Sequence, residues 1–279
     1  GNWYHTEASL GRGRHYTYSE VAIICGLTLK AIYHLTLSST QGFVTSLLSM
    51  LKLDLACPNY STFCRRQKEL KVELPRSLAG TERIDVVFDS TGLKVYGEGE
   101  WKVRQHGYSK RRTWRKLSLL MDVNNQEIIS AVLSTNEYHD KELLEDLLEG
   151  VETPLGDALG DGGYDSHASF ELICQKGGNP IIPPRKDAKI RCHGNCKEKP
   201  LARDQVLRQM RKISRKRWKQ ETHYHRRSLI ETAMFRVKTI FGDKLSNRVF
   251  EHQATEAFIR CRALNLMTQM GMPESYKII

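Results

Sequence analysis

The residues from Tyr224 to Phe241 read Tyr-His-Arg-Arg-Ser-Leu-Ile-Glu-Thr-Ala-Met-Phe-Arg-Val-Lys-Thr-Ile-Phe. Counted at about 100° per residue, this pattern predicts one amphipathic helix across the segment, followed by Gly242 as a natural C-terminal cap. Apolar residues fall on one side of the helix, and four polar residues form a narrow stripe on the other: Tyr224, Arg227, Glu231 and Lys238. An ordinary surface helix with an Arg–Glu pair would give the same pattern. The rest of the sequence therefore has to show whether this polar stripe is a functional site or only a solvated face.

The spacing Tyr224-x2-Arg227-x3-Glu231-x6-Lys238 resembles the signature of bacterial insertion-sequence DDE transposases, most closely that of the insertion-sequence-five group. In that family the glutamate is the last of three metal-binding carboxylates, and the first two are aspartates on upstream strands. Two aspartates of this sequence match them in type, order and neighbours: Asp89, in Ile84-Asp-Val-Val-Phe-Asp-Ser-Thr-Gly, and Asp161, in Ala158-Leu-Gly-Asp-Gly-Gly. The resemblance extends from about Tyr18 to about Met270.

The resemblance implies a ribonuclease-H-like α/β fold with a mixed sheet, in which Asp89, Asp161 and Glu231 are the catalytic and metal-binding residues. Three carboxylates can hold two divalent cations about 4 Å apart and leave positions open for phosphate and water. Mg²⁺ is the implied cofactor, with Mn²⁺ as a substitute. The implied reaction cleaves phosphodiester bonds at the ends of an insertion sequence and joins the 3′-hydroxyl ends to target DNA. We therefore expect the three carboxyl groups to converge to within roughly 4–8 Å.

The same resemblance implies double-stranded DNA as the partner, in the form of terminal inverted repeats and target DNA. It also implies a homodimer or higher oligomer on DNA, and a bacterial cytoplasmic protein that is associated with the nucleoid when bound. Tyr224, Arg227 and Lys238 are expected to contact the DNA, the two cations through its phosphates. The alternative function is a catalytically silent DNA-binding regulator derived from a truncated transposase, although a pure binding protein has no use for three such carboxylates.

Basic residues are concentrated in two blocks. Residues 183–219 hold 14 Lys and Arg against three acidic residues, and residues 101–116 hold seven against none, in a chain with a formal net charge of +11. The remaining sequence is therefore acidic, and this asymmetry indicates a polyanionic partner more than a solvated basic face. The candidate DNA contacts in the blocks are Lys110, Arg111, Arg112, Arg115, Lys116, Arg215, Lys216 and Arg217. Trp101, Trp114 and Trp218 are expected to be available for stacking on an unpaired base.

Apolar spacing predicts helices over residues 18–37 and 40–51, and a short basic helix over residues 61–70. Together they resemble a helix-turn-helix with Arg65 and Arg66 near the DNA, and a dimerisation or packing subdomain is equally compatible with them. We expect a helical domain over residues 1–80 and a catalytic domain over residues 81–270, with an insertion at about 183–222 and a tail over 271–279.

In the catalytic part, β-branched residues predict strands over 84–89 and 93–96, separated by a Ser90-Thr91-Gly92 turn. A hairpin over 117–123 and 127–135 follows, around Asn124-Asn125. Further along we expect an acidic amphipathic helix over 139–150, a strand over 157–161, a helix over 166–177 capped by Ser166, a strand over 180–182 and a last helix over 253–270.

Several other features have alternative interpretations. Cys192 and Cys196 form half of a zinc site or are two free thiols in a polar loop. His223-x-x-Arg226 is a box seen in tyrosine recombinases, for which Tyr276 is the one tyrosine downstream. The aspartates Asp85, Asp122 and Asp165 compete as metal ligands but lack the family neighbours. No apolar run of 18 residues is present, so no membrane-spanning helix is expected.

Overall fold

The computed structural model describes residues 2–5, 16–74, 83–95, 114–192 and 201–271. The chain divides into two compact units, and the division passes through one strand and one helix. The helical unit comprises residues 1–74, 94–113 and 237–270. The sheet unit comprises residues 75–93, 114–236 and 271–279, and it contains every candidate metal-binding carboxylate.

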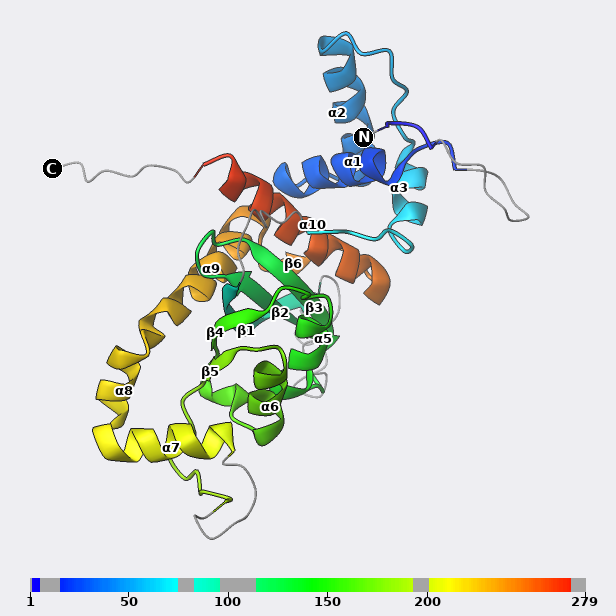
Figure 1. Ribbon diagram of the computed structural model, residues 1–279. Coiled ribbons are helices and arrows are strands. Elements are labelled where there is room, and N and C mark those ends of the chain that lie inside the picture. The colour runs from blue at the N-terminus through cyan, green and yellow to red at the C-terminus, as the bar shows by residue number, and fades with distance from the viewer. Residues whose placement is uncertain (1, 6–15, 75–82, 96–113, 193–200, 272–279) are drawn as a thin grey trace, which may run out of the picture. The chain divides into compact units, whose positions relative to one another are not determined.

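The sheet unit is built on a mixed sheet with the strand order β3-β2-β1-β4-β5 (Figure 1). The strands are β1 (Ile84–Val95), β2 (Trp114–Asp122), β3 (Ile128–Thr135), β4 (Leu155–Leu159) and β5 (Asn179–Ile181). Strands β2 and β3 pair antiparallel, whereas β4 pairs parallel with both β1 and β5. The expected α/β class with a mixed sheet is therefore confirmed.

Strand β1 forms the centre of the core of this unit. Ile84, Val86 and Phe88 alternate along it and are at most 1% exposed, as expected for the inward face of a strand. They pack in one cluster with residues of α5 (Leu144–Glu149) and α6 (His167–Gln175). A Cβ on Gly160 would lie 2.3 Å from the ring of Phe88. Glycine at this position therefore lets the end of β4 approach β1 closely, which brings the residue after it toward Asp89.

One predicted turn is absent. Residues 84–89 and 93–96 were expected to be two strands, but Ser90, Thr91 and Gly92 continue β1 without a break. A Cβ on Gly92 would lie 3.2 Å from the ring of Trp114. The glycine therefore allows a close approach by an aromatic ring, which is the other common reason for glycine inside a strand.

Two predicted helices begin differently from expectation. The segment 139–150 starts with a 3₁₀ turn, η1 (Asp140–Glu142), before α5 begins. The segment 224–241 likewise starts with a 3₁₀ turn, η3 (Tyr224–Arg227), followed by α9 (Ser228–Phe241). In η3 the side chains of Arg226 and Arg227 form ion pairs with carboxylates of β1, and these long-range contacts hold a turn that the helical pattern did not predict.

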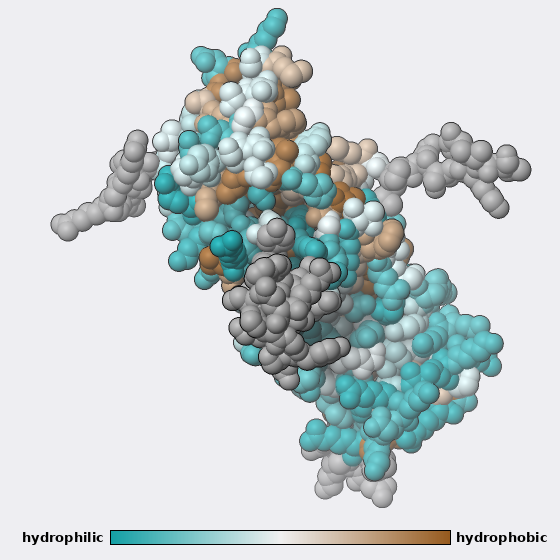
Figure 2. All heavy atoms as spheres, turned by 180° about the vertical axis from the view of Figure 1, so that it is seen from behind, coloured by the Kyte–Doolittle hydropathy of each residue, from teal (hydrophilic) through white to brown (hydrophobic). Residues whose placement is uncertain are grey.

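The insertion after β5 contains α7 (Ala202–Ile213) and α8 (Arg215–Glu221). Hydrophilic side chains cover these two helices on the face seen in Figure 2. Asp165 joins α7 to the rest of the sheet unit. Both of its carboxylate oxygens accept hydrogen bonds from Arg203 on α7, at 2.6 and 2.9 Å. The Asp165 side chain has no exposed surface.

The helical unit contains α1 (Glu20–Ile32), α2 (Leu37–Met50), α3 (Tyr60–Arg66), β6 (Lys244–Leu245) and α10 (Phe250–Gln269), and α10 lies against α1 (Figure 1). Ile23, Leu27 and Phe63 pack with Ile259 of α10 in one core cluster. In the described part of the chain no single helix is long and apolar enough to cross a membrane, and α1 and α2 pass that test only as a pair bent by 110°.

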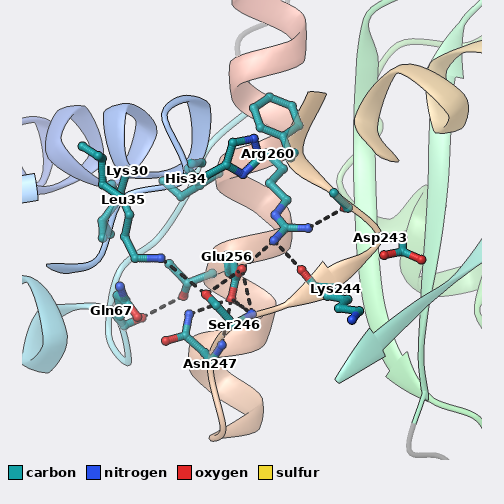
Figure 3. A pocket seen from close by; sticks show the side chains of 16 residues that line it. Lys30, His34, Leu35, Gln67, Asp243, Lys244, Ser246, Asn247, Glu256 and Arg260 are labelled. Carbon is teal, nitrogen blue, oxygen red and sulfur yellow. Dashed lines mark hydrogen bonds and ion pairs between the residues drawn. The ribbon is translucent and has the colours of Figure 1, made fainter. Parts of the chain in front are cut away.

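A buried ion pair organises the start of α10 (Figure 3). Arg260 donates to Glu256 at 2.6 Å and to the backbone oxygens of Gly242 and Lys244 at 3.0 and 2.7 Å. Glu256 in turn accepts from the backbone nitrogens of Ser246 and Asn247. The pair thus ties the segment between α9 and α10 to α10, beside a cavity of about 300 Å³.

Replacing Arg260 with methionine is expected to lower the free energy of unfolding by about 3–5 kcal/mol, because it leaves the Glu256 carboxylate buried without its partner. Urea denaturation followed by circular dichroism measures this change. Arg248→Met removes an exposed arginine nearby and is expected to cost less than about 0.5 kcal/mol. Equal stability of the two variants would show that the Arg260–Glu256 pair does not stabilise the fold.

Candidate active site

Asp89 lies on β1 with its side chain 19% exposed. Its Oδ1 accepts a hydrogen bond from the backbone nitrogen of Ser90 at 2.8 Å, and its Oδ2 accepts one from Nη1 of Arg227 at 2.7 Å. Burial raises the pKa of Asp89, and the negative charge of Asp161 adds to this rise, whereas the Ser90 hydrogen bond and the Arg227 charge oppose it. The charge of Asp161 is thus felt at Asp89.

Glu231 stands in the first turn of α9 with its side chain 53% exposed. Nη2 of Arg227 donates to its Oε1, while Nη1 of the same guanidinium holds Asp89. One cation therefore bridges the carboxylates of the strand and the helix. The two residues are far apart in sequence, so this contact fixes the start of α9 against β1.

Asp161 follows directly after β4 and Gly160. It is the N-cap of the turn η2 (Gly162–Tyr164), and its Oδ1 accepts from the backbone nitrogen of Gly163 at 2.7 Å. Tyr164 is buried and its hydroxyl lies 3.1 Å from Oγ of Ser90, the neighbour of Asp89. The pKa of Tyr164 is raised first by burial and further by the carboxylates of Asp140, Asp89 and Asp161.

The Tyr224 hydroxyl is influenced by the same charged residues. Burial raises the pKa of its hydroxyl, the charge of Arg227 opposes this rise, and the charges of Asp161, Asp89 and Glu231 add to it. Lys219 Nζ lies over the Tyr224 ring, 4.7 Å from its centre. The tyrosine, the arginine and all three carboxylates of the sequence pattern thus share one electrostatic environment in the sheet unit.

The donor set fits a hard divalent cation, since carboxylate oxygens are the ligands that Mg²⁺ and Mn²⁺ prefer. The guanidinium of Arg227 already forms ion pairs with two of these acids, Asp89 and Glu231. Among the described residues no three His, Cys, Asp or Glu side chains form a ready-made metal cluster. A bound ion would have to share Asp89 and Glu231 with this guanidinium or displace it.

The competing acids have structural partners. Asp85 accepts from the backbone nitrogen of Asp157 at 2.8 Å, where the β1–β4 pairing is irregular, and Arg226 joins both carboxylates at 2.8 and 2.7 Å. Asp122 accepts from the backbone nitrogen of Asn124 at 2.7 Å and shapes the β2–β3 turn. Asp165 is occupied by Arg203.

The candidate DNA contacts are distributed over both units. Arg115 and Lys116 lie on β2, and Arg215, Lys216 and Arg217 lie on α8, whereas Lys110, Arg111 and Arg112 fall outside the described residues. Lys238 lies on α9, in the part of it that belongs to the helical unit.

Two expectations about these contacts need correction. Trp218 is 1% exposed, so it cannot stack on a base as expected; it packs beside Tyr224 instead. Arg66 is 6% exposed, donates to the backbone oxygen of Tyr18 and lies over the Tyr16 ring, which gives it a packing role. Arg65 on the same helix is exposed. Trp101 falls outside the described residues, and Trp114 lies on β2 against Gly92.

The sequence interpretation missed two residues beside the site. Arg226, the clamp on Asp85 and Asp157, was considered only as part of a recombinase box. Asp140 fell within the predicted acidic amphipathic helix over 139–150 and was not singled out, but it begins η1, and its side chain lies beside Gly163 of η2. Nothing local in the sequence marks either residue, because their partners are distant along the chain. Cys196 of the possible zinc site and Tyr276 of the recombinase interpretation lie outside the described residues.

Comparison with protein-family models identifies the family of the chain. A model described as a transposase DDE domain matches residues 80–266, and a second model with the same description matches residues 1–98. The first match covers more than half of the chain, so the chain belongs to the DDE transposase family. The match also excludes the tyrosine-recombinase reading of His223-x-x-Arg226.

Membership of this family defines the class of protein. The chain is a transposase, and its class of enzyme combines nuclease and transferase activity. The mixed sheet with its helices is the ribonuclease-H-like fold of a DDE transposase domain. The family binds DNA and generally uses divalent metal ions. Nothing in these matches favours a catalytically silent regulator.

Proposed function

We propose that this transposase cleaves phosphodiester bonds at the ends of its element and joins the 3′-hydroxyl ends to target DNA, with Asp89, Asp161 and Glu231 as catalytic metal ligands. The observation that carries the proposal is the Arg227 bridge between Asp89 and Glu231, which brings together acids from a strand and a distant helix. Asp161, at the end of the neighbouring strand β4, completes the set.

Two Mg²⁺ or Mn²⁺ ions held there would supply an activated water and neutralise charge on the attacked phosphate and the leaving oxygen. The protein's part is to hold the carboxylates on rigid elements before DNA arrives. β1 is buried in the core, and Arg226 fastens the turn before α9 to β1 and β4. The Glu231 side chain is half exposed, as a ligand that must meet a substrate phosphate needs to be.

DNA binding would use Tyr224, Arg227 and Lys238 together with the two basic blocks. In the described chain these blocks present Arg115, Lys116, Arg215, Lys216 and Arg217, and in the helical unit Arg65 is the exposed candidate. Cations with this distribution suit phosphate contacts that position a duplex, and no base-specific contact follows from them.

We extend the proposal to the organisation of the protein. Residues 1–80 would act as a helical domain for DNA binding or dimerisation, and residues 81–270 as the catalytic domain with its insertion at about 183–222. A homodimer or higher oligomer would assemble on the element's inverted repeats in the bacterial cytoplasm. The Tyr224-x2-Arg227-x3-Glu231-x6-Lys238 spacing supports membership of the insertion-sequence-five group.

Removing divalent metal with EDTA is expected to abolish nicking of a labelled inverted-repeat end, and adding Mg²⁺ or Mn²⁺ should restore it. DNA binding measured on the same samples should persist in EDTA, because it depends mainly on Lys and Arg contacts with phosphates.

The control variant is Glu145→Gln, which removes an exposed carboxylate on α5 and should cut at the parent rate with Mg²⁺. Nicking that continues in excess EDTA would contradict metal-dependent cleavage. A protein that binds the end but never cuts it with either metal would be the silent regulator.

A further inference from the structure

We propose that Asp140 is a fourth carboxylate of the metal site, paired with Asp161 across Gly163. The inference rests on the proposed function of Asp89, Asp161 and Glu231, and it adds a residue from η1 that the sequence analysis did not name as a metal ligand. The role assigned to Asp140 is to bind or orient divalent metal together with Asp161.

The position of Asp140 is defined by Gly163. A Cβ built on this glycine would lie 2.8 Å from Oδ1 of Asp161 and 3.5 Å from Oδ2 of Asp140. Two carboxylates from separate turns therefore border the same small space, which only a residue without a side chain leaves open. Turns η1 and η2 are also in direct contact.

The turn that carries Asp140 is held in place on both sides. The Glu142 carboxylate accepts a hydrogen bond from the backbone nitrogen of His139 at 2.9 Å, which closes the turn. Leu143 and Leu144 follow and are buried in the core of the sheet unit. The Asp140 side chain is thus presented by a fixed element, as a ligand must be if it is to be preorganised.

The charges around Asp140 leave the pair with Asp161 only partly compensated. Oδ1 of Asp140 lies 3.1 Å from Nζ of Lys116. Within the described chain no cation forms an ion pair with Asp161, which accepts the Gly163 hydrogen bond at 2.7 Å. Two like charges at close range repel each other, and a divalent cation is the ligand class that would relieve the repulsion.

The experiment measures Mn²⁺ binding to the full chain without DNA, by electron paramagnetic resonance of the free ion. Asp140→Asn is expected to weaken binding by about tenfold or more, in the range found for residues that support a metal site. Lys116→Met removes the competing cation and is expected to leave the affinity equal or higher. Glu145→Gln, which removes an exposed carboxylate on the neighbouring helix, is the matched control and should bind as the parent does.

The different results expected for Asp140→Asn, which loses affinity, and Lys116→Met, which does not, distinguish a ligand from a structural ion pair. If Asp140 serves only to hold Lys116, the two variants should weaken binding alike, and that result would overturn the inference. So would an Asp140→Asn variant that binds Mn²⁺ as the parent does. A separate arm, Asp89→Asn, tests the proposed function: if it leaves Mn²⁺ affinity unchanged, the whole metal site fails, whereas a loss there with none at Asp140 rejects Asp140 alone.

A second variant, which should gain affinity for a different metal ion, tests the inference even if Asp140→Asn folds poorly. Asp140→Cys is expected to raise the affinity for Cd²⁺ relative to Mn²⁺ by about tenfold or more, because a thiolate prefers a softer metal ion than a carboxylate does. Glu145→Cys adds a thiol on α5 outside the site and corrects for cysteines elsewhere in the chain. An Asp140→Cys variant with the same Cd²⁺ preference as Glu145→Cys would contradict a metal-binding role.

Discussion

Replacing Glu231 with glutamine is expected to slow strand cleavage by on the order of a thousandfold or more, the loss typical of one preorganised charge-stabilising group. Glutamine keeps the size of the side chain but loses the charge that holds a hard cation. The fold should survive, because the Glu231 side chain is 53% exposed and Arg226 still anchors the turn before α9. Single-turnover nicking of a labelled inverted-repeat end measures the rate, and a gel-shift assay on the same DNA should show near-normal binding.

Asp89→Asn and Asp161→Asn are expected to cause losses of the same order. The three losses should not multiply when combined, because the carboxylates act as one unit. Glu171→Gln is the matched control, since Glu171 is exposed on α6 and has no assigned role. If Glu231→Gln cuts at the parent rate, the polar stripe on α9 belongs to an ordinary surface helix and the assigned site is wrong.

DNA affinity is expected to fall by on the order of a thousandfold or more between about 50 and 200 mM salt, provided that six or more phosphates are contacted. Exposed cations of the second basic block should account for part of this dependence. Changing Lys212, Lys216 and Arg217 together to glutamine should therefore lower the slope of log affinity against log salt by about three. Fluorescence anisotropy of a labelled inverted repeat measures both quantities.

The control for this variant keeps the charges and exchanges the side chains, as Lys212→Arg, Lys216→Arg and Arg217→Lys, and it should retain the parent slope. Arg215 is left unchanged because it donates to the backbone oxygen of Pro184 and so has a structural contact. An affinity that does not respond to salt would reject phosphate contacts as the main source of binding. A parent slope in the glutamine variant would place those contacts elsewhere on the protein.

Local patterns predicted the secondary structure where local forces decide it. The hairpin around Asn124-Asn125 is confirmed, since alternating apolar residues and a turn signal are sufficient to form it. The cap of α6 is confirmed as well, because the Ser166 side chain accepts from the backbone nitrogen of Ser169 within the same turn. The mixed α/β class followed from the order of such elements together with the family resemblance.

Contacts between distant residues account for the differences. Arg227 and Asp89 are 138 positions apart, and Arg226 and Asp85 are 141 apart, yet their ion pairs join the 3₁₀ turn η3 to β1. The proximity of Asp140 to Asp161 likewise depends on how the turns η1 and η2 pack against each other. Periodicity cannot report such contacts. The sequence pattern nevertheless named Asp89 and Glu231, two acids that Arg227 joins in the structure. Their catalytic role stays a prediction.

The Arg227 bridge has a consequence for how the enzyme is loaded. A guanidinium tethered between Asp89 and Glu231 competes for them at an effective concentration far above that of any free cation, on the order of millimolar or more for a short link. Incoming DNA phosphates offer this guanidinium an alternative partner. Metal affinity should therefore be higher on the DNA complex than on the free protein, and reciprocity requires metal to tighten DNA binding by the same factor. Such coupling would delay the reactive assembly until the substrate has arrived.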